Sequence, residues 1–239
     1  MSLRTRLLAL CVVLCGFVVI AAEPEPGVSK EDAARKAVAA KADDKKWTSL
    51  FDGKTLTGWK KPVFGTEGEI EVKDGAIRLG FGDGCTGVTL DKEFPKSGYE
   101  IELEARRFEG NDFFCGLTFP VEKSACTFVV GGWGGTLVGL SCLDGQDAAN
   151  NDTSKFMDFK EKTWYKIRVR VIPERITTWI DDKETSDAKL KDREVSIRSE
   201  VELSKPLGIT SWKTTADLRN IRYRTLTDAE KKAALPKEE

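Results

Sequence analysis

The most constraining feature of this sequence is a strict alternation of apolar and charged residues in two segments. Residues 99–106 read YEIELEAR, and residues 165–171 read YKIRVRV. A period of two is typical of a β-strand with one face in a core and the other towards water. A shift of one residue would bury the charges. The pattern therefore predicts that five apolar residues face the core, namely Ile101, Leu103, Ile167, Val169 and Val171.

Short strands are predicted along most of the remaining chain. Further candidates are residues 69–72, 76–81, 113–119, 127–130, 137–143, 176–180 and 207–212. Gly, Pro, Asp or Asn separates most of them, and helical periodicity is missing from this region. The sequence therefore predicts an all-β fold, an antiparallel two-sheet β-sandwich of jelly-roll type. Trp59 and Trp179 are predicted to pack in its core.

The first 22 residues are predicted to be a signal peptide rather than part of the fold. Two arginines precede an apolar run from Leu7 to Ile20, and Ala21 and Ala22 supply small residues for cleavage. The run is too short to span a bilayer comfortably. We therefore expect an exported protein, periplasmic or extracellular, with no membrane span.

The rest of the chain divides into three regions by composition. Residues 23–46 are rich in Ala, Lys and acidic residues, with Ser29 as a helix cap, and are predicted to form a short polar helical linker. Residues 47–226 carry the predicted sandwich. Residues 227–239 form a polar tail that begins with a second capped helical pattern.

Charge and composition exclude several classes of function. The chain contains no histidine, which excludes a Ser-His-Asp triad and histidine-bound zinc, so proton transfer must use other groups. Without the leader, 36 of the 38 basic residues remain against 39 acidic ones, a formal charge of −3. This weakly acidic surface argues against nucleic acid as a partner and suits a neutral ligand such as a sugar. The oligomeric state is left open.

Four cysteines remain after the leader, and disulfides are expected in an oxidising compartment. Cys115 and Cys126 flank the turn-rich residues 120–124, so a hairpin would place them opposite each other and allow a disulfide. Cys85 and Cys142 would then pair by elimination. Free, buried thiols are the alternative, since a domain of this size can fold without disulfides.

The two ends of the predicted sandwich resemble a known family. Residues 47–59 read WTSLFDGKTLTGW, and residues 218–224 read LRNIRYR. The first segment resembles the opening LF(D/N)GKxLxGW signature of the 3-keto-disaccharide hydrolase domain family (DUF1080), and the second resembles its closing FRNIRIR strand. Between these ends, similarity to the family's strands extends over residues 99–106, 109–117 and 164–182.

The resemblance implies a concanavalin- or laminin-G-like sandwich that cleaves glycosides whose C3 hydroxyl group has been oxidised to a ketone. The ketone acidifies the hydrogen on C2, so a base removes it, the group on C1 leaves, and water then adds. Such a site needs a base, an electrophile for the enolate oxygen and a surface on which a sugar stacks.

Positions that match the family's site supply the candidate residues. The predicted catalytic residues are Asp112, Asp144 and Lys213, and the predicted substrate-binding residues are Asn111, Trp133, Ser141 and Trp212. The two aspartates are candidate bases, Lys213 is the candidate electrophile, and the tryptophans are the candidate stacking walls. We expect Asp112, Trp133, Asp144 and Trp212 to open onto one cleft.

Two groups of acidic residues are open to a second interpretation. Glu100, Glu102 and Glu104 have a spacing that touches that of glycosidase carboxylate pairs, but are interpreted as a solvated face crossed by ion pairs between strands. Residues 144–152 are rich in oxygen ligands, which makes calcium the one metal that this chain would hold. Their spacing does not match an EF-hand, so a plain solvated loop and no cofactor are expected.

Two other functions stay open at this point. Residues 126–133 and 206–213 contain no acidic residue and no histidine, although the family has such groups at the corresponding positions. This departure favours a non-catalytic carbohydrate-binding module. The charged linker favours an envelope-associated structural protein.

Overall fold

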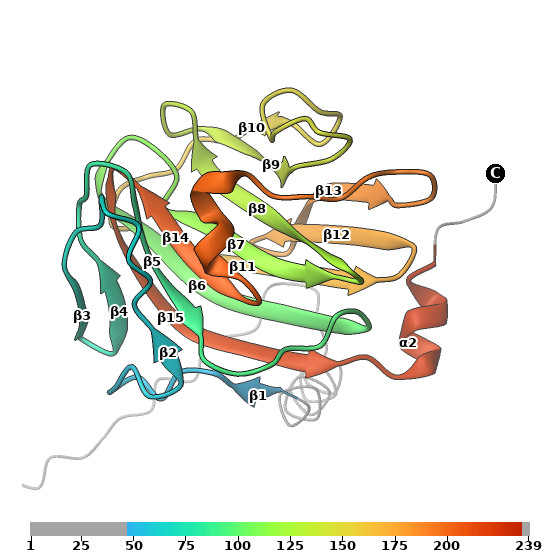
Figure 1. Cartoon of the computed structure of the whole chain (residues 1–239), viewed down its shortest axis with the longest axis horizontal. Coiled ribbons are helices and arrows are strands. Elements are labelled where there is room, and N and C mark those ends of the chain that lie inside the picture. Colours follow the sequence, from blue (N-terminus) through green and yellow to red (C-terminus); the bar gives the residue numbers. More distant parts are fainter. Residues whose placement is uncertain (1–46, 236–239) are drawn as a thin grey trace, which may run out of the picture. The chain divides into compact units, whose positions relative to one another are not determined.

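The computed structural model describes residues 47–235, which fold as two antiparallel sheets packed face to face (Figure 1). The predicted signal peptide, residues 1–22, and the predicted linker, residues 23–46, lie outside the described residues. The prediction of an antiparallel two-sheet sandwich is confirmed. Within residues 47–235, no helix has the length and apolar character needed to cross a bilayer.

An eight-stranded sheet forms one layer. Its order is β13 (Lys183–Lys189), β12 (Arg175–Ile180), β11 (Tyr165–Ile172), β6 (Tyr99–Gly110), β15 (Thr214–Thr225), β4 (Ala76–Leu79) and β3 (Ile70–Lys73). The short strand β1 (Thr48–Ser49) also pairs with β15. The capped helical pattern at the C-terminus forms α2 (Asp228–Ala233), with Thr227 as its N-cap in a capping box.

A seven-stranded sheet forms the other layer. Its order is β10 (Lys155–Phe156), β9 (Leu137–Ser141), β8 (Ser124–Gly132), β7 (Cys115–Val121), β14 (Gly208–Trp212), β5 (Cys85–Leu90) and β2 (Trp59–Lys60). A short 3₁₀ helix, η1 (Ser199–Ser204), contacts β5 and β14. It is the orange coil that crosses over this sheet in Figure 1.

The core lies between the two layers, and the predicted alternation is confirmed there. In the β6–β11 pair, Leu103 lies opposite Ile167 and Ile101 opposite Val169, and all four are fully buried together with Val171. Phenylalanine, leucine and isoleucine residues of the seven-stranded sheet pack against them. Each such side chain contributes about 1.5–3 kcal/mol when it leaves water.

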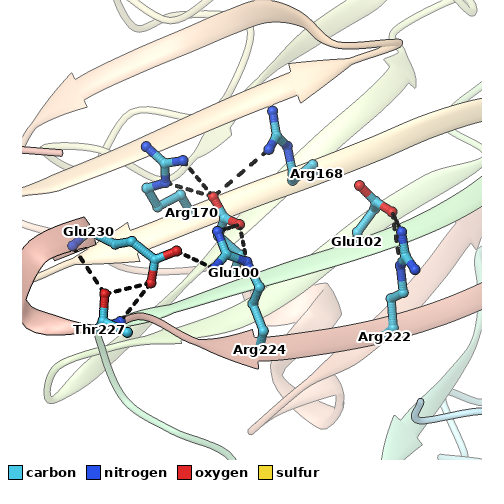
Figure 2. Close-up of polar contacts among 8 residues, drawn as sticks. All are labelled: Glu100, Glu102, Arg168, Arg170, Arg222, Arg224, Thr227 and Glu230. Atoms are coloured by element: carbon cyan, nitrogen blue, oxygen red, sulfur yellow. Dashed lines mark hydrogen bonds and ion pairs between the residues drawn. The ribbon is translucent and has the colours of Figure 1, made fainter. Parts of the chain in front are cut away.

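Glutamate and arginine side chains cover the outer face of the eight-stranded sheet. The Glu100 carboxylate accepts hydrogen bonds from Arg170 Nε at 2.7 Å and Arg224 Nε at 2.8 Å, and Arg168 lies 3.9 Å away (Figure 2). The predicted ion pairs between strands are therefore present. Glu100 is fully buried and Glu102 is also buried, however, so this part of the face is not solvated as expected.

Flanking pairs extend this network along the sheet. Glu102 pairs with Arg222 at 2.7 Å, and Glu104 pairs with Arg219 at 2.6 Å. At the other end Arg224 also pairs with Glu230 of α2 at 2.6 Å and lowers the pKa of that carboxyl group to about 2 (Figure 2). The network therefore ties α2 to the sheet.

Only one of the two tryptophans predicted to be in the core is found there. Trp59 is buried, and its Nε1 donates a hydrogen bond to the Leu50 carbonyl oxygen at 2.8 Å. Trp179 instead lies on the outer face, with the Arg168 guanidinium 4.3 Å from its ring centroid. The reason is the period of two, because its neighbour Ile180 faces the core.

Neither predicted disulfide forms, and all four described cysteines are free and buried. The β7–β8 hairpin exists, but Cys115 lies opposite Val130 and Cys126 opposite Phe119. The two cysteines are thus offset by four residues, roughly 13 Å along the strands, whereas a disulfide needs Cα atoms within about 7 Å.

The second predicted pair is separated across the sheet. Strands β14, β7 and β8 lie between Cys85 on β5 and Cys142, which follows β9. The separation is roughly 19 Å at the usual spacing of strands. Burial raises the pKa of Cys126 to about 12, and burial together with the charge of Glu200 raises that of Cys85 to about 12. These thiols therefore stay protonated.

Glu100→Gln is expected to lower the free energy of unfolding by about 3 kcal/mol, because it removes a fully buried carboxylate from the buried Arg224 and the partly buried Arg168 and Arg170. Glu104→Gln is the matched control. Its carboxylate is 28% exposed and Arg219 is 38% exposed, so the loss there should stay below about 1 kcal/mol. Urea unfolding of both variants measures the difference. Equal losses would contradict the assigned role of Glu100.

A thiol titration tests the cysteine assignment. Ellman's reagent should count four thiols per chain when residues 23–239 are unfolded in urea without reductant, because the structure has four free cysteines. The folded protein should react slowly, since the thiols are buried. A count of two or none after unfolding would show that disulfides form after all.

Candidate functional site

A cleft of about 260 Å³ lies on the outer face of the seven-stranded sheet, beneath η1. This volume is slightly below the range of about 300–1,000 Å³ typical of small-molecule sites, so the cleft suits a ligand of about one sugar ring. Its walls are formed by Cys85, Asp112, Phe113, Thr127, Val129, Trp133, Ser141, Arg198, Glu200, Val201 and Trp212.

Gly116 on β7 supports the Phe113 ring beside the cleft. A Cβ atom there would come within 2.8 Å of Thr210 Oγ1 and 3.0 Å of the Phe113 ring. The glycine therefore lets Phe113 lie against the sheet, which keeps the space above the strands open.

Two aromatic side chains form one wall of the cleft. The Phe113 and Trp212 ring centroids are 6.5 Å apart, and the ring planes are tilted by 33°. The Trp212 backbone N–H donates to the Phe113 carbonyl oxygen at 3.0 Å, so the β6–β7 connection and the end of β14 hold the rings together. Such a surface accepts the C–H face of a sugar ring.

A third aromatic residue, Trp133, lies in the turn between β8 and β9 and is 44% exposed. The buried Arg107 of β6 holds this turn. Its Nη2 donates to the carbonyl oxygens of Gly131 at 3.3 Å and Gly135 at 2.7 Å. Gly135 has φ = 100°, and a Cβ atom there would meet Arg107 Nη1 at 2.9 Å, which explains the glycine.

Asp112 is the half-buried carboxylate of the cleft. Its Oδ1 accepts hydrogen bonds from the backbone N–H groups of Phe113 at 2.7 Å and Trp133 at 3.2 Å. Oδ2 has no hydrogen-bond partner among the described residues. Burial raises the pKa of Asp112, opposed by the two backbone hydrogen bonds and by the charge of Arg107. One oxygen is thus anchored, and the other is available to accept a proton.

An arginine and a second carboxylate enter the cleft from the η1 segment. Arg198 Nη2 donates to Glu200 Oε1 at 2.6 Å, and Arg198 Nη1 donates to Asp147 Oδ2 at 3.0 Å. The hydrogen bond from Arg198 lowers the pKa of Glu200, and the same bond raises the pKa of Arg198. Both groups are therefore charged at neutral pH.

Four of the seven predicted site residues line the cleft, namely Asp112, Trp133, Ser141 and Trp212. Asn111 does not, and it is exposed beside Asp112. Lys213 is also outside and exposed. It follows the end of β14, in the connection to β15, where its φ is 43° and its N–H donates to the Gly84 carbonyl oxygen at 3.1 Å.

Asp144 also lies outside the cleft walls, and an arginine already pairs with its carboxylate. Arg193 Nε donates to Asp144 Oδ2 at 2.8 Å, and Arg193 Nη1 donates to Asp152 Oδ2 at 2.9 Å. The Arg193 guanidinium thus already binds the carboxylate oxygens that a cation held by residues 144–152 would need as ligands. Over residues 47–235, no cluster of three or more His, Cys, Asp or Glu side chains is placed to hold a metal ion.

The remaining cleft residues were missed by the sequence analysis. They are Cys85, Phe113, Thr127, Val129, Arg198, Glu200 and Val201. The alternation of side chains along a strand could have predicted that Thr127 and Val129 face outwards, because they flank the core residue Phe128. Nothing in the spacing of Arg198 and Glu200 indicates that η1 crosses this sheet.

The chain matches a family model over most of its length. The model is that of the 3-keto-alpha-glucoside-1,2-lyase-like domain, and it matches residues 46–224. No curated protein is significantly similar in sequence.

Similar folds occur in solved structures of low sequence identity. The Crh5 transglycosylase in complex with NAG is 13% identical with a TM-score of 0.55, over 77% of this chain and 86% of that one. The potassium-bound Emp46p carbohydrate recognition domain is 12% identical with a TM-score of 0.52, over 75% and 96%. A presumed glycosyl hydrolase from Parabacteroides distasonis ATCC 8503 is 14% identical with a TM-score of 0.50, over 78% and 97%. These likenesses show the shared fold.

The two cleft carboxyl groups should titrate in opposite directions from their ordinary values. Carboxyl-carbon NMR should place the pKa of Asp112 above 3.8, because burial disfavours its charge, and that of Glu200 below 4.5, because Arg198 favours its charge. Arg198→Gln should raise the pKa of Glu200 while leaving that of Asp112 in place. Shifts of the same sign in the parent protein would contradict this geometry.

Proposed function

We propose that this chain, which belongs to the 3-keto-alpha-glucoside-1,2-lyase-like domain family, is an exported enzyme that cleaves 3-keto-glycosides in the cleft beneath η1. One observation carries the proposal. A half-buried carboxylate with one free oxygen, Asp112, shares a small cleft with the aromatic rings of Trp133 and Trp212. Export is proposed from the sequence pattern of residues 1–22.

Asp112 is the proposed base. The C3 ketone of the substrate makes the hydrogen on C2 acidic, and Asp112 Oδ2 takes this proton while Oδ1 stays anchored by the two backbone N–H groups. The electron pair of the C–H bond forms the enolate, which then expels the oxygen on C1 and forms a C1–C2 double bond. The leaving oxygen takes the proton back from Asp112, which regenerates the carboxylate. Water adds to the unsaturated sugar in the hydrolytic outcome. A raised pKa suits this role because it makes the carboxylate a better base.

The aromatic residues position the ring. Trp212 and Phe113 offer one stacking surface, and the more exposed Trp133 offers a second at the rim. Ser141 and Thr127 place hydroxyl groups on the floor, where sugar hydroxyl groups can exchange hydrogen bonds with them.

A non-catalytic carbohydrate-binding module is the second candidate. It is favoured by the pairing of Glu200 with Arg198, which leaves Asp112 as the one cleft carboxylate that is not in an ion pair among the described residues. The aromatic walls would serve a binding module equally well.

Asp112→Asn is expected to reduce turnover of a 3-keto-glucoside by about 10²–10⁴-fold, because the amide cannot take the proton. Asp144→Asn is the matched control, since Asp144 lies outside the cleft walls and pairs with Arg193. Purified mature protein is assayed with methyl 3-keto-α-glucoside and 3-keto-trehalose. Unchanged turnover in the Asp112 variant would exclude it as the base. Binding of these sugars without turnover in the parent protein would support the binding module.

A further inference from the structure

Arg198 is the one cation among the residues that line the cleft. It does not stand alone, because the Glu200 carboxylate lies beside it on the same wall. An isolated arginine would select an anionic ligand. A guanidinium held against a carboxylate instead presents donors and acceptors side by side, and this pattern matches a neutral ligand that carries an acceptor next to a donor.

We propose that the Arg198–Glu200 pair recognises the α-hydroxyketone of the substrate, Arg198 donating to the C3 carbonyl oxygen and Glu200 accepting from the hydroxyl group on C4. The inference rests on the proposed function, because it assumes a 3-keto-sugar in this cleft. It makes the η1 segment the part of the fold that selects an oxidised sugar over its parent glycoside.

Hydrogen-bonding capacity remains on both partners. The Arg198 guanidinium has five N–H donors. Three are used, by Nε and Nη2 towards Glu200 at 3.4 and 2.6 Å and by Nη1 towards Asp147 at 3.0 Å. A carboxylate has about four acceptor sites, and Glu200 accepts two of these bonds and one from Ser199 Oγ at 3.2 Å. Two donors and one acceptor are therefore left for a ligand.

Accessibility and rigidity also fit the role. The side chains of Arg198 and Glu200 are 46% and 40% exposed, so a ligand in the cleft reaches both. Asp147, which is 17% exposed, anchors the guanidinium from outside the cleft walls. Its Oδ1 in turn accepts from the Ala149 N–H at 3.1 Å and Asn150 Nδ2 at 2.8 Å. The pair is therefore oriented before the ligand arrives, which lowers the entropic cost of binding.

The ketone is the group that this arrangement distinguishes. A carbonyl oxygen only accepts hydrogen bonds, so it satisfies the Arg198 donors without presenting a hydrogen towards them. In the parent glycoside the C3 hydroxyl group must turn its own hydrogen away and competes with the C4 hydroxyl group for Glu200. Oxidation at C3 thus matches the ligand to the fixed donor and acceptor of the pair.

The test is a mutant cycle between the protein and the ligand. Affinity of the full chain is measured by calorimetry for methyl 3-keto-α-glucoside and for its 4-deoxy analogue, with wild type, Glu200→Gln and Asp147→Asn. Glu200→Gln should weaken binding of the first ligand roughly 10–100-fold, the effect of a hydrogen bond to a charged group, and should scarcely change binding of the 4-deoxy sugar. Asp147→Asn should change both affinities by the same factor, because Asp147 contacts Arg198 and not Glu200, the residue proposed to bind the C4 hydroxyl group.

A parallel comparison tests Arg198. Wild type should prefer methyl 3-keto-α-glucoside over methyl α-glucoside, and Arg198→Gln should lose roughly 10-fold or more of that preference. Equal losses for both members of the ligand pair, caused by Glu200→Gln or by Arg198→Gln, would overturn the inference, since a purely structural role weakens all ligands alike. Failure of the wild-type protein to bind or turn over any of these sugars would instead overturn the proposed function.

Discussion

The register between β6 and its two neighbours is the constraint on which the rest of the structure depends. β6 pairs with β11 on one side and β15 on the other. Because side chains alternate along a strand, this one register sends Ile101 and Leu103 into the core and sends Glu100 and Glu102 to the arginines of the outer face. A slip of one residue would break the core and the ion pairs together.

The same strand also builds the cleft of the opposite sheet. Beyond its charged stretch, β6 carries Arg107, and the connection that follows carries Asp112 and Phe113. The core register thus sets the point along β6 at which the chain leaves the eight-stranded sheet. It therefore also sets where Asp112 and Phe113 lie relative to β8 and β14. Fold and site are therefore positioned by one element.

The sequence could predict those features that repeat with a period of two. The core faces of β6 and β11, the two-sheet sandwich and the outward ion pairs all follow from the alternation of apolar and charged residues. The predictions that failed concern which residues lie opposite each other on neighbouring strands, or which face of a strand carries a side chain. Cys115 and Cys126 flank the expected hairpin, yet its register offsets them. Trp179 is predicted to lie in the core, although the alternation around it points outwards.

The site was predictable only where a local sequence signature marks its residues. Asp112, Trp133, Ser141 and Trp212 lie at strand ends or in turns that the family signatures align, and they share one cleft. Arg198 and Glu200 belong to a segment whose path over the sheet depends on tertiary contacts with β5 and β14, which no local pattern encodes. Lys213 shows that a residue adjacent in sequence to a cleft residue need not line the cleft, since Trp212 lines it and Lys213 does not.

Arg107 has a consequence for the mechanics of the site. It is rooted in the eight-stranded sheet, yet its guanidinium holds the turn that carries Trp133 in the other layer. Trp212 is also joined to both layers, because it ends β14 and only Lys213 separates it from β15 of the eight-stranded sheet. Both tryptophans of the cleft are therefore tied to the eight-stranded sheet, Trp133 through the Arg107 hydrogen bonds and Trp212 through the chain itself. The aromatic walls thus keep their spacing only while the two sheets keep their packing, so a substitution in the core between the sheets would reach the cleft without touching any residue that lines it.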